Sequence, residues 1–132
     1  MKELSVAQII NRFLPFIGGT ELLVYSLSQE LVNRGIKVTV LTTNSTKFRG
    51  IEHFRTYKPT EIINGIKVIR KRAFLNAPGI VFAPTFAFST IMHDFDIFHI
   101  HGLLSNISIE SVTFLKTLKK KTPTILTTHD VT

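Results

Sequence analysis

Apolar runs alternate along the chain with stretches of helical periodicity. Ser5 to Ile10 is a short apolar run that predicts a buried strand, and Ile36 to Leu41, rich in β-branched residues, predicts a second one. Between them, Leu23, Leu27 and Leu31 recur every fourth residue and predict one face of a helix. Strand, helix and strand in so short a stretch predict a βαβ unit, with parallel strands and a right-handed crossover.

Local signals mark the ends of this expected helix. Thr20 is a fair N-cap, and Glu21 in the first turn suits the positive end of the helix dipole. Glu30 and Arg34 are spaced for an ion pair one turn apart. Gly35 then fits the position after the C-cap, where the backbone often turns left-handed.

The middle of the chain mixes loop, hairpin and helix signals. The stretch 42–60 is polar and basic and is expected to be a loop. An Asn-Gly pair at 64–65 stands between the apolar stretches 61–63 and 66–70 and predicts a β-hairpin. An uncharged segment follows, in which we expect a helix from about Pro84 to His93.

The last third of the chain repeats the strand and helix pattern. Asp96 to His101 predicts a strand, and Thr124 to Thr128 predicts the final one. The helix between them ends near the cationic run Lys119 to Lys121, and its expected apolar stripe consists of Ile107, Ser111, Phe114 or Leu115, and Leu118. Alternating strands and helices predict an α/β fold for residues 1–132, with a Rossmann-like, doubly wound and mostly parallel sheet that carries a β-hairpin.

Composition and charge narrow the classes of function. The chain has no cysteine, which excludes disulfides, thiolate zinc sites and thiol catalysis and fits a reducing, cytoplasmic compartment. The formal net charge of +7 favours anionic partners, but no nucleic-acid-binding motif is present, so nucleic acid is not an expected partner. The uncharged run from Ala73 to Met92 is broken by proline and glycine and is not expected to span a membrane.

Candidate chemistry follows the strands, because doubly wound folds bind ligands beyond the carboxyl ends of their strands. Gly18 and Gly19 fall at such an end, where a helix begins and its N–H groups suit an anion; a tight structural turn is the other interpretation. His101 ends its strand and is expected to serve function, whereas His99 is expected to be a core histidine.

A metal site is the weaker interpretation of the histidines and aspartates near the last strands. His99, His101 and His129 are enough for zinc by number, but their spacing matches no common zinc pattern. Asp94 and Asp96 match the D-x-D letters of metal-dependent glycosyltransferases. They precede their strand and are interpreted as a turn and a strand start, so no metal site is expected.

Four stretches carry a family resemblance: IINRFLPFIGGTELLVYSLSQELVNRGIKVTVLTTN, NGIKVIRKRAF, FDIFHIHG and TPTILTTHD. In this order they resemble the opening of retaining glycosyltransferases of family 4. The resemblance implies the GT-B fold, in which two Rossmann-like domains face each other across a cleft. Residues 1–132 would then be the N-terminal, acceptor-side half. The C-terminal donor-binding domain would be absent, since no glutamates here have the family's Glu-x(7)-Glu spacing.

The resemblance also implies roles for individual residues. Gly18 and Gly19 would approach the donor diphosphate, whose charge grows as it leaves and is stabilised by backbone N–H groups. His101 would lie near the transferred sugar and is the catalytic candidate. The other donor- or substrate-binding candidates are His129 and Asp130, for which a plain turn is the equal alternative. The acceptor-side candidates are Thr20, Glu21 and Asn44.

The expected partners follow from the same resemblance. They are a nucleotide sugar and a glycan or lipid-linked acceptor, with no metal or other cofactor, and the chain by itself is expected to transfer no sugar. Arg70 to Arg72 and the uncharged run after them would suit peripheral contact with an anionic membrane at its inner face, although a solvated basic face is the favoured alternative. The competing function is a stand-alone α/β module that binds an anion or a nucleotide.

Overall fold

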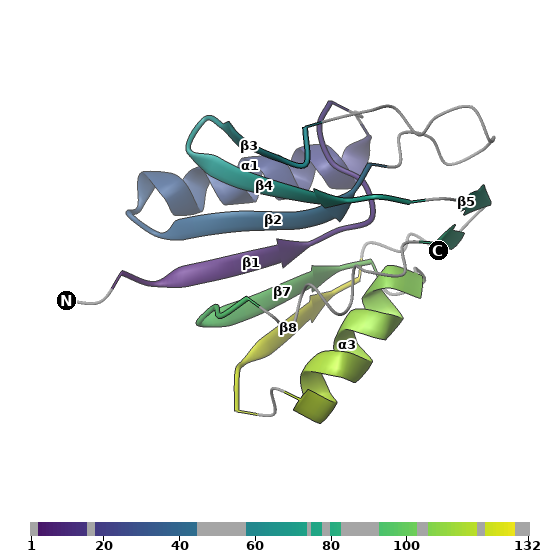
Figure 1. The fold of residues 1–132 in the computed structure, drawn as a ribbon. Coiled ribbons are helices and arrows are strands. Elements are labelled where there is room, and N and C mark those ends of the chain that lie inside the picture. The colour runs from purple at the N-terminus through teal and green to yellow at the C-terminus, as the bar shows by residue number, and fades with distance from the viewer. Residues whose placement is uncertain are drawn as a thin grey trace.

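A six-stranded sheet forms the centre of the molecule (Figure 1). The computed structural model describes residues 3–15, 18–44, 58–73, 75–77, 80–82, 93–102, 106–118 and 121–128. The elements are β1 (Ser5–Ile9), α1 (Gly19–Asn33), β2 (Lys37–Thr43), β3 (Thr60–Ile63), β4 (Ile66–Lys71), β5 (Leu75–Ala77), β6 (Ile80–Phe82), β7 (Ile97–His101), α3 (Asn106–Leu118) and β8 (Thr124–Thr127).

The strand order of the large sheet is β3-β4-β2-β1-β7-β8. All of its neighbouring strands run parallel except β3, which is antiparallel to β4. The chain starts at β1 in the middle and builds outward on both sides, which confirms the predicted doubly wound α/β sheet with its hairpin. A second, two-stranded antiparallel sheet, β5 with β6, lies in the uncharged segment and was not predicted.

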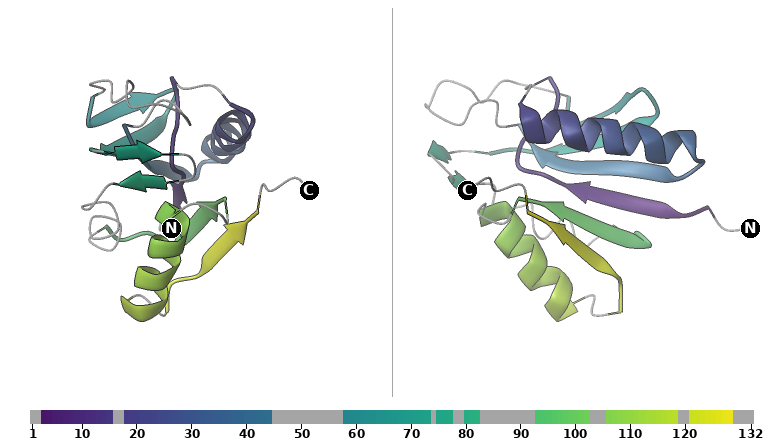
Figure 2. Two further views of the ribbon diagram at one scale, coloured as in Figure 1. Left: turned by 90° about the vertical axis from the view of Figure 1, so that its right-hand side faces the viewer. Right: turned by 180° about the vertical axis from the view of Figure 1, so that it is seen from behind.

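The two helices cover opposite faces of the large sheet, as the two views of Figure 2 show. Val24 of α1 packs in one core cluster with Val40 of β2 and Val68 of β4. Ile107 and Leu115 of α3 pack in the other cluster, together with Phe98 and Ile100 of β7 among others. Because side chains alternate along a strand, β2 and β4 supply residues to both clusters: Leu41 and Ile69 to the cluster of α3, and Val40 and Val68 to the cluster of α1.

The leucine face predicted for α1 does not coincide with its buried face, because Leu23 is 53% exposed. Val24 and Ser28 are the buried residues of this helix, and Leu31 packs only partly against the same cluster. Val24 and Ser28 have smaller side chains than leucine, so the helix can approach the strands closely. Hydrophobicity alone selected the leucines, whereas packing against the sheet selected the adjacent helix face.

The predicted cap of α1 is also wrong, because Thr20 lies inside the helix. Gly18 is the N-cap residue, with extended backbone (φ −138°, ψ 178°) and no side-chain cap. The other end agrees with expectation. Arg34 Nε lies 2.9 Å from Glu30 Oε1, and Gly35 has a φ of +82°.

The hairpin prediction is confirmed, with φ values of +47° at Asn64 and +84° at Gly65 in the turn between β3 and β4. The expected loop 42–60 is shorter at both ends, because β2 continues to Thr43 and β3 begins at Thr60. Residues 84–92 of the expected helix lie outside the described residues, and His93 is described but not helical.

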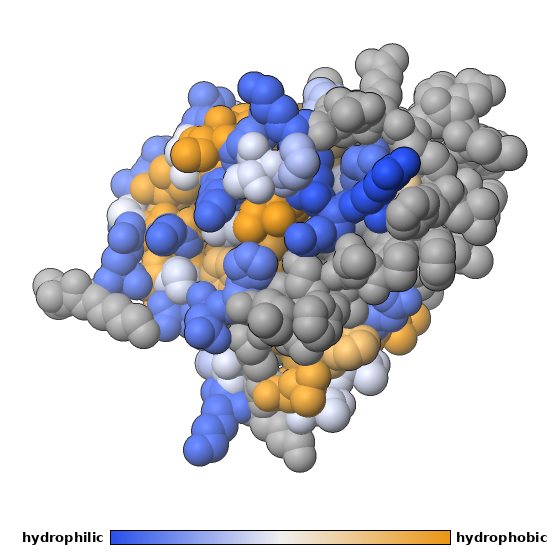
Figure 3. Space-filling view, in the orientation of Figure 1, coloured by the Kyte–Doolittle hydropathy of each residue, from blue (hydrophilic) through white to orange (hydrophobic). Residues whose placement is uncertain are grey.

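The stripe predicted for α3 holds at Ile107, Ser111 and Leu115, which are buried. Phe114 and Leu118 are instead exposed, as is Ile109. Figure 3 shows apolar surface in the region of α3. Neither of the two helices described, α1 or α3, is long and apolar enough to cross a lipid bilayer.

Candidate functional site

The site is built where β1 and β7 end side by side. These strands pair in parallel, with Ile9 opposite Ile100, so their carboxyl ends meet at one edge of the sheet. From this edge the chain leads from β1 through residues 10–18 into α1, and from β7 toward α3. The first turn of α1 and the end of β7 therefore belong to the same edge, as expected for the ligand side of a doubly wound sheet.

The start of α1 is open to an approaching group. The first amide that donates within the helix is that of Leu22, to the carbonyl of Gly18 (3.0 Å), so the amides of Gly19 and Thr20 have no intrahelical acceptor. Among the residues that the structure describes, a Cβ built on Gly19 would meet no atom within 4 Å. The extended backbone of Gly18 can be adopted by any residue. Among the described residues, neither the backbone conformation of Gly18 nor the space around a Cβ at Gly19 therefore requires glycine.

A buried cation follows β1 at the same edge. Arg12 is buried, and this desolvation lowers the pKa of its guanidinium below its usual value, while the negative charge of Glu21 raises it. Glu21 lies in the first turn of α1. The sequence analysis missed Arg12, although an arginine directly after an apolar strand was a usable signal. Its charge adds positive potential to that of the helix start.

His101 is held below the edge by Gln8 of β1. Its side chain is buried, and its Nε2 atom lies 2.5 Å from Gln8 Oε1. An amide oxygen only accepts, so Nε2 of His101 carries the proton in this pair. The sequence analysis missed Gln8, the one polar side chain within the apolar stretch from Val6 to Ile10.

His99 lies next to His101 and faces the same side of the sheet. The two ring centroids are 4.0 Å apart, and His99 Nε2 is 2.6 Å from Thr127 Oγ1 of β8. The partly buried, hydrogen-bonded His99 agrees with the expected core histidine.

Asn44, expected on the acceptor side, is engaged within the protein. Its side-chain Oδ1 accepts a hydrogen bond from the backbone amide of Ala73 (2.7 Å). Its backbone amide donates to the carbonyl of Lys71 (3.1 Å). These bonds tie the end of β2 to the end of β4. Thr20 and Glu21 lie in the first turn of α1, whereas His129 and Asp130 lie outside the described residues.

The aspartates of the D-x-D letters lie at the wrong end of the sheet, as interpreted. Asp96 Oδ2 accepts from the amide (2.8 Å) and the hydroxyl (3.1 Å) of Ser5, at the amino ends of β1 and β7. Asp94 is exposed. Across the part of the chain that the structure describes, no three histidine, cysteine, aspartate or glutamate side chains gather into a potential metal site.

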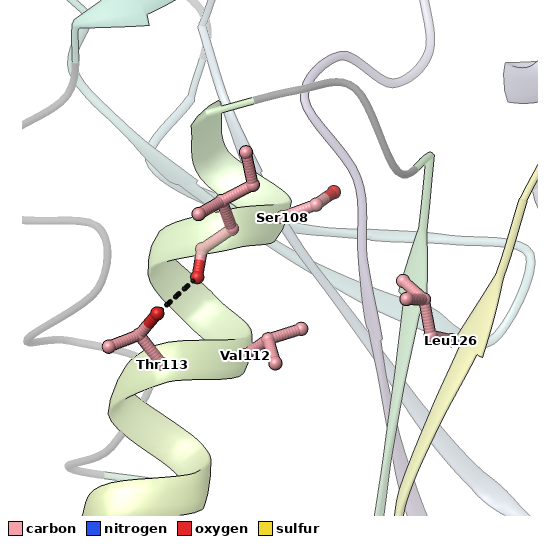
Figure 4. Close-up of a pocket in the computed structure, with 5 residues that line it drawn as sticks. Ser108, Val112, Thr113 and Leu126 are labelled. Carbon is pink, nitrogen blue, oxygen red and sulfur yellow. Dashed lines mark hydrogen bonds between the residues drawn. The ribbon is translucent and has the colours of Figure 1, made fainter.

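A separate pocket of about 170 Å³ lies between α3 and β8 (Figure 4). It is lined by Ser108, Ile109, Val112, Thr113 and Leu126. The hydroxyl of Thr113 is directed back to the carbonyl of Ile109 (2.9 Å), so the lining is mostly apolar and carries no charge. The pocket therefore lacks the groups that a phosphate requires.

Comparison with known proteins agrees with the resemblance found in the sequence. Residues 17–132 match the family model of Glycosyltransferase Family 4. Over 133 aligned residues the chain is 26% identical to the phosphatidylinositol N-acetylglucosaminyltransferase GPI3 subunit of Saccharomyces cerevisiae, in three strains. The alignment covers 96% of this chain but 27% of the relative, so the chain spans about a quarter of the length of these relatives. On the family match over most of its length, the chain belongs to glycosyltransferase family 4.

Proposed function

We propose that this chain is the N-terminal, acceptor-side domain of a glycosyltransferase that moves a sugar from a nucleotide-sugar donor to an acceptor with retention of configuration. The observation that carries the proposal is the open helix start at Gly18 and Gly19. Among the described residues, the extended backbone of Gly18 and the open space around a Cβ at Gly19 do not require glycine, and both residues lie at the edge where such folds bind ligands. Family membership supplies the reaction class.

The helix start would act on the leaving group. Departure of a nucleoside diphosphate builds negative charge on its phosphate oxygens. The amides of Gly19 and Thr20 are fixed donors that can stabilise this charge, and the buried charge of Arg12 adds to the attraction. On this basis we propose that no divalent metal is needed.

Because His101 is buried, it would lie beneath the sugar site. It is buried with its imidazole held by Gln8, so its orientation is set before any ligand arrives. We assign it a place under the transferred sugar. His129 and Asp130, which follow β8, are proposed as further substrate-binding residues on the neighbouring strand.

A lipid-linked acceptor is the first to test. The relative's name states a phosphatidylinositol acceptor for that protein. In this chain Leu22 and Leu23, in the first turns of α1, are about half exposed and offer apolar surface next to the helix start. Thr20 and Glu21 would contact the acceptor there, and Asn44 would act from the end of β2. Such an acceptor implies peripheral contact with an anionic membrane from the cytoplasmic side.

The donor would bind mainly to a second domain, so the chain alone is proposed to transfer no sugar. The test is a transfer assay with radiolabelled uridine and guanosine diphosphate sugars and vesicles that contain phosphatidylinositol. It is run on this chain and on the longer native protein that carries it. We expect turnover only with the longer protein. No turnover by either, with every donor tested, would contradict the proposal.

The second candidate is the stand-alone module that binds an anion or a nucleotide, which the same helix start supports. Titration calorimetry of this chain with nucleoside diphosphates separates the two. Stoichiometric, tight binding by the chain itself, together with no transferase activity in any longer form, would favour the module.

A further inference from the structure

Arg70 is a buried cation at the carboxyl end of β4. Its side chain is 2% exposed, and its Nη1 atom pairs with the carboxylate of Glu61 on β3 and donates to the carbonyl of Lys58 (3.2 Å). Its Nη2 atom donates to the carbonyl of Leu14 (2.6 Å). One planar guanidinium thus joins β4 to two other segments of the chain, residues 58–61 and Leu14, which its rigid fork of donors allows.

The hydrogen bond from Arg70 to Leu14 connects two parts of the chain that strand pairing does not connect. β2 lies between β4 and β1, so no strand pairing connects β4 to the chain that leaves β1. The Arg70 side chain extends past β2 and donates a hydrogen bond to the carbonyl of Leu14, which is 56 positions away in the sequence. A buried ion pair is in general weak evidence for added stability, so the geometry it imposes is the more informative property.

The carbonyl of Leu14 lies shortly before the start of α1 in the sequence. Only three residues separate Leu14 from Gly18, the N-cap of α1. Upstream, the hydroxyl of Thr43 on β2 donates to the carbonyl of Asn11 (2.6 Å). The segment that leads from β1 to α1 is therefore held at Asn11 from β2 and at Leu14 from β4.

We propose that Arg70 is a positioning residue: by holding the Leu14 carbonyl it fixes the approach to Gly18 and Gly19, and so the direction of the first amides of α1. The importance of this direction for a bound diphosphate rests on the proposed function. The holding of the segment does not. Arg70 would touch neither donor nor acceptor, because its donors are engaged within the protein.

The test uses this chain and its variants Arg70→Met and Arg70→Lys. Arg70→Met removes all the donors but keeps much of the volume. Arg70→Lys keeps the charge toward Glu61, but a single ammonium cannot reproduce the fork that also reaches Leu14. If Arg70→Met does not fold, the same measurements are made on Arg70→Lys.

Two control variants separate positioning from general stability. Val68→Ala lies on the same strand and the same face and is fully buried, so it lowers stability without touching Leu14. Glu61→Gln neutralises the partner on β3 but leaves the bond from Arg70 to Leu14 in place.

Two readouts are taken by NMR. The first is hydrogen exchange at the amide of Leu22, which donates to Gly18. The second is the affinity for inorganic pyrophosphate, followed through the amide shifts of Gly18 and Gly19. We expect the Arg70 variants to speed exchange at Leu22 by about tenfold beyond Val68→Ala at equal global stability, and to weaken pyrophosphate by a similar factor. Glu61→Gln should change both far less.

The outcomes are distinct. If exchange at Leu22 in the Arg70 variants is no faster than in Val68→Ala, the positioning proposal is overturned. If exchange rises as expected but pyrophosphate binds neither the native chain nor any variant, Arg70 still positions the segment. In that case the proposed phosphate role of Gly18 and Gly19 fails instead.

Discussion

Nε2 of His101 lies 2.5 Å from Oε1 of Gln8, which joins β7 to β1 within the buried interior of the sheet. The two residues are 93 positions apart in the sequence. The contact orients the imidazole that we place beneath the sugar site.

Replacing Gln8 with leucine should therefore be more damaging than its size suggests. Gln8→Leu keeps a similar volume but leaves the buried N–H of His101 without this acceptor, so we expect the free energy of unfolding to fall by about 1–3 kcal/mol. Urea denaturation measures the change. The double variant with His101→Phe should lose less than the sum of the two single variants. Strict additivity would show that the pair does not interact.

Gly19→Val should impair binding without impairing folding. A Cβ at this position has no atom of the described residues within 4 Å, so we expect the free energy of unfolding to change by no more than about 0.5 kcal/mol. The affinity for pyrophosphate should fall by at least about tenfold, because the valine occupies the approach to the first amides of α1. Asn33→Val, at the other, exposed end of α1, is the matched control and should bind normally. Unchanged affinity in Gly19→Val would rule the helix start out as the anion site.

Arg12→Met should weaken the binding of pyrophosphate, and its effect on stability can be measured separately. Burial lowers the pKa of Arg12, which means that its charge is held at an energetic penalty. Urea denaturation of the same variant measures its effect on the free energy of unfolding separately. The variant should weaken pyrophosphate several-fold and reduce the dependence of binding on salt. Arg34→Met removes an exposed cation from the far end of α1 and should leave the affinity unchanged. Equal losses of affinity in both variants would mean that only net charge matters.

The hairpin glycine offers a test of the fold itself. Gly65 has a φ of +84°, and a Cβ there would lie 3.1 Å from Cγ1 of Val32. Gly35 has a nearly equal φ of +82° but open space around it. We expect Gly35→Ala to lose about 1 kcal/mol from backbone strain alone and Gly65→Ala to lose more, because α1 and the turn must also move apart. Thermal unfolding of the two variants gives the comparison, and equal losses would contradict the close contact between the turn and Val32.

Local patterns predicted the secondary structure well where the cause is local. The Asn-Gly turn, the glycine after α1 and the Glu30–Arg34 pair depend on neighbouring residues only, and all three are present. The apolar runs likewise located β1, β2, β7 and β8 to within one or two residues at each end, because a buried parallel strand needs a short continuous apolar segment.

Local patterns failed where a distant neighbour makes the choice. The side of α1 that is buried runs through Val24 rather than Leu23, since the sheet beneath accepts the smaller side chains. Thr20 has the chemistry of a cap, but the helix begins before it, at Gly19. In each case the tertiary structure selected one of two adjacent options that the sequence left nearly equal.

The sequence alone thus determined the order of the elements, the parallel α/β class and the glycine pair between the first strand and the first helix. It carried no sign of the contacts that organise the site, Gln8 with His101 and Arg70 with Leu14. These contacts join residues from strands that are far apart in the chain, and they form only because the sheet order places β1 between β2 and β7, and β4 beyond β2. A buried polar side chain needs a partner, but which partner it finds is decided by the packing of the whole sheet.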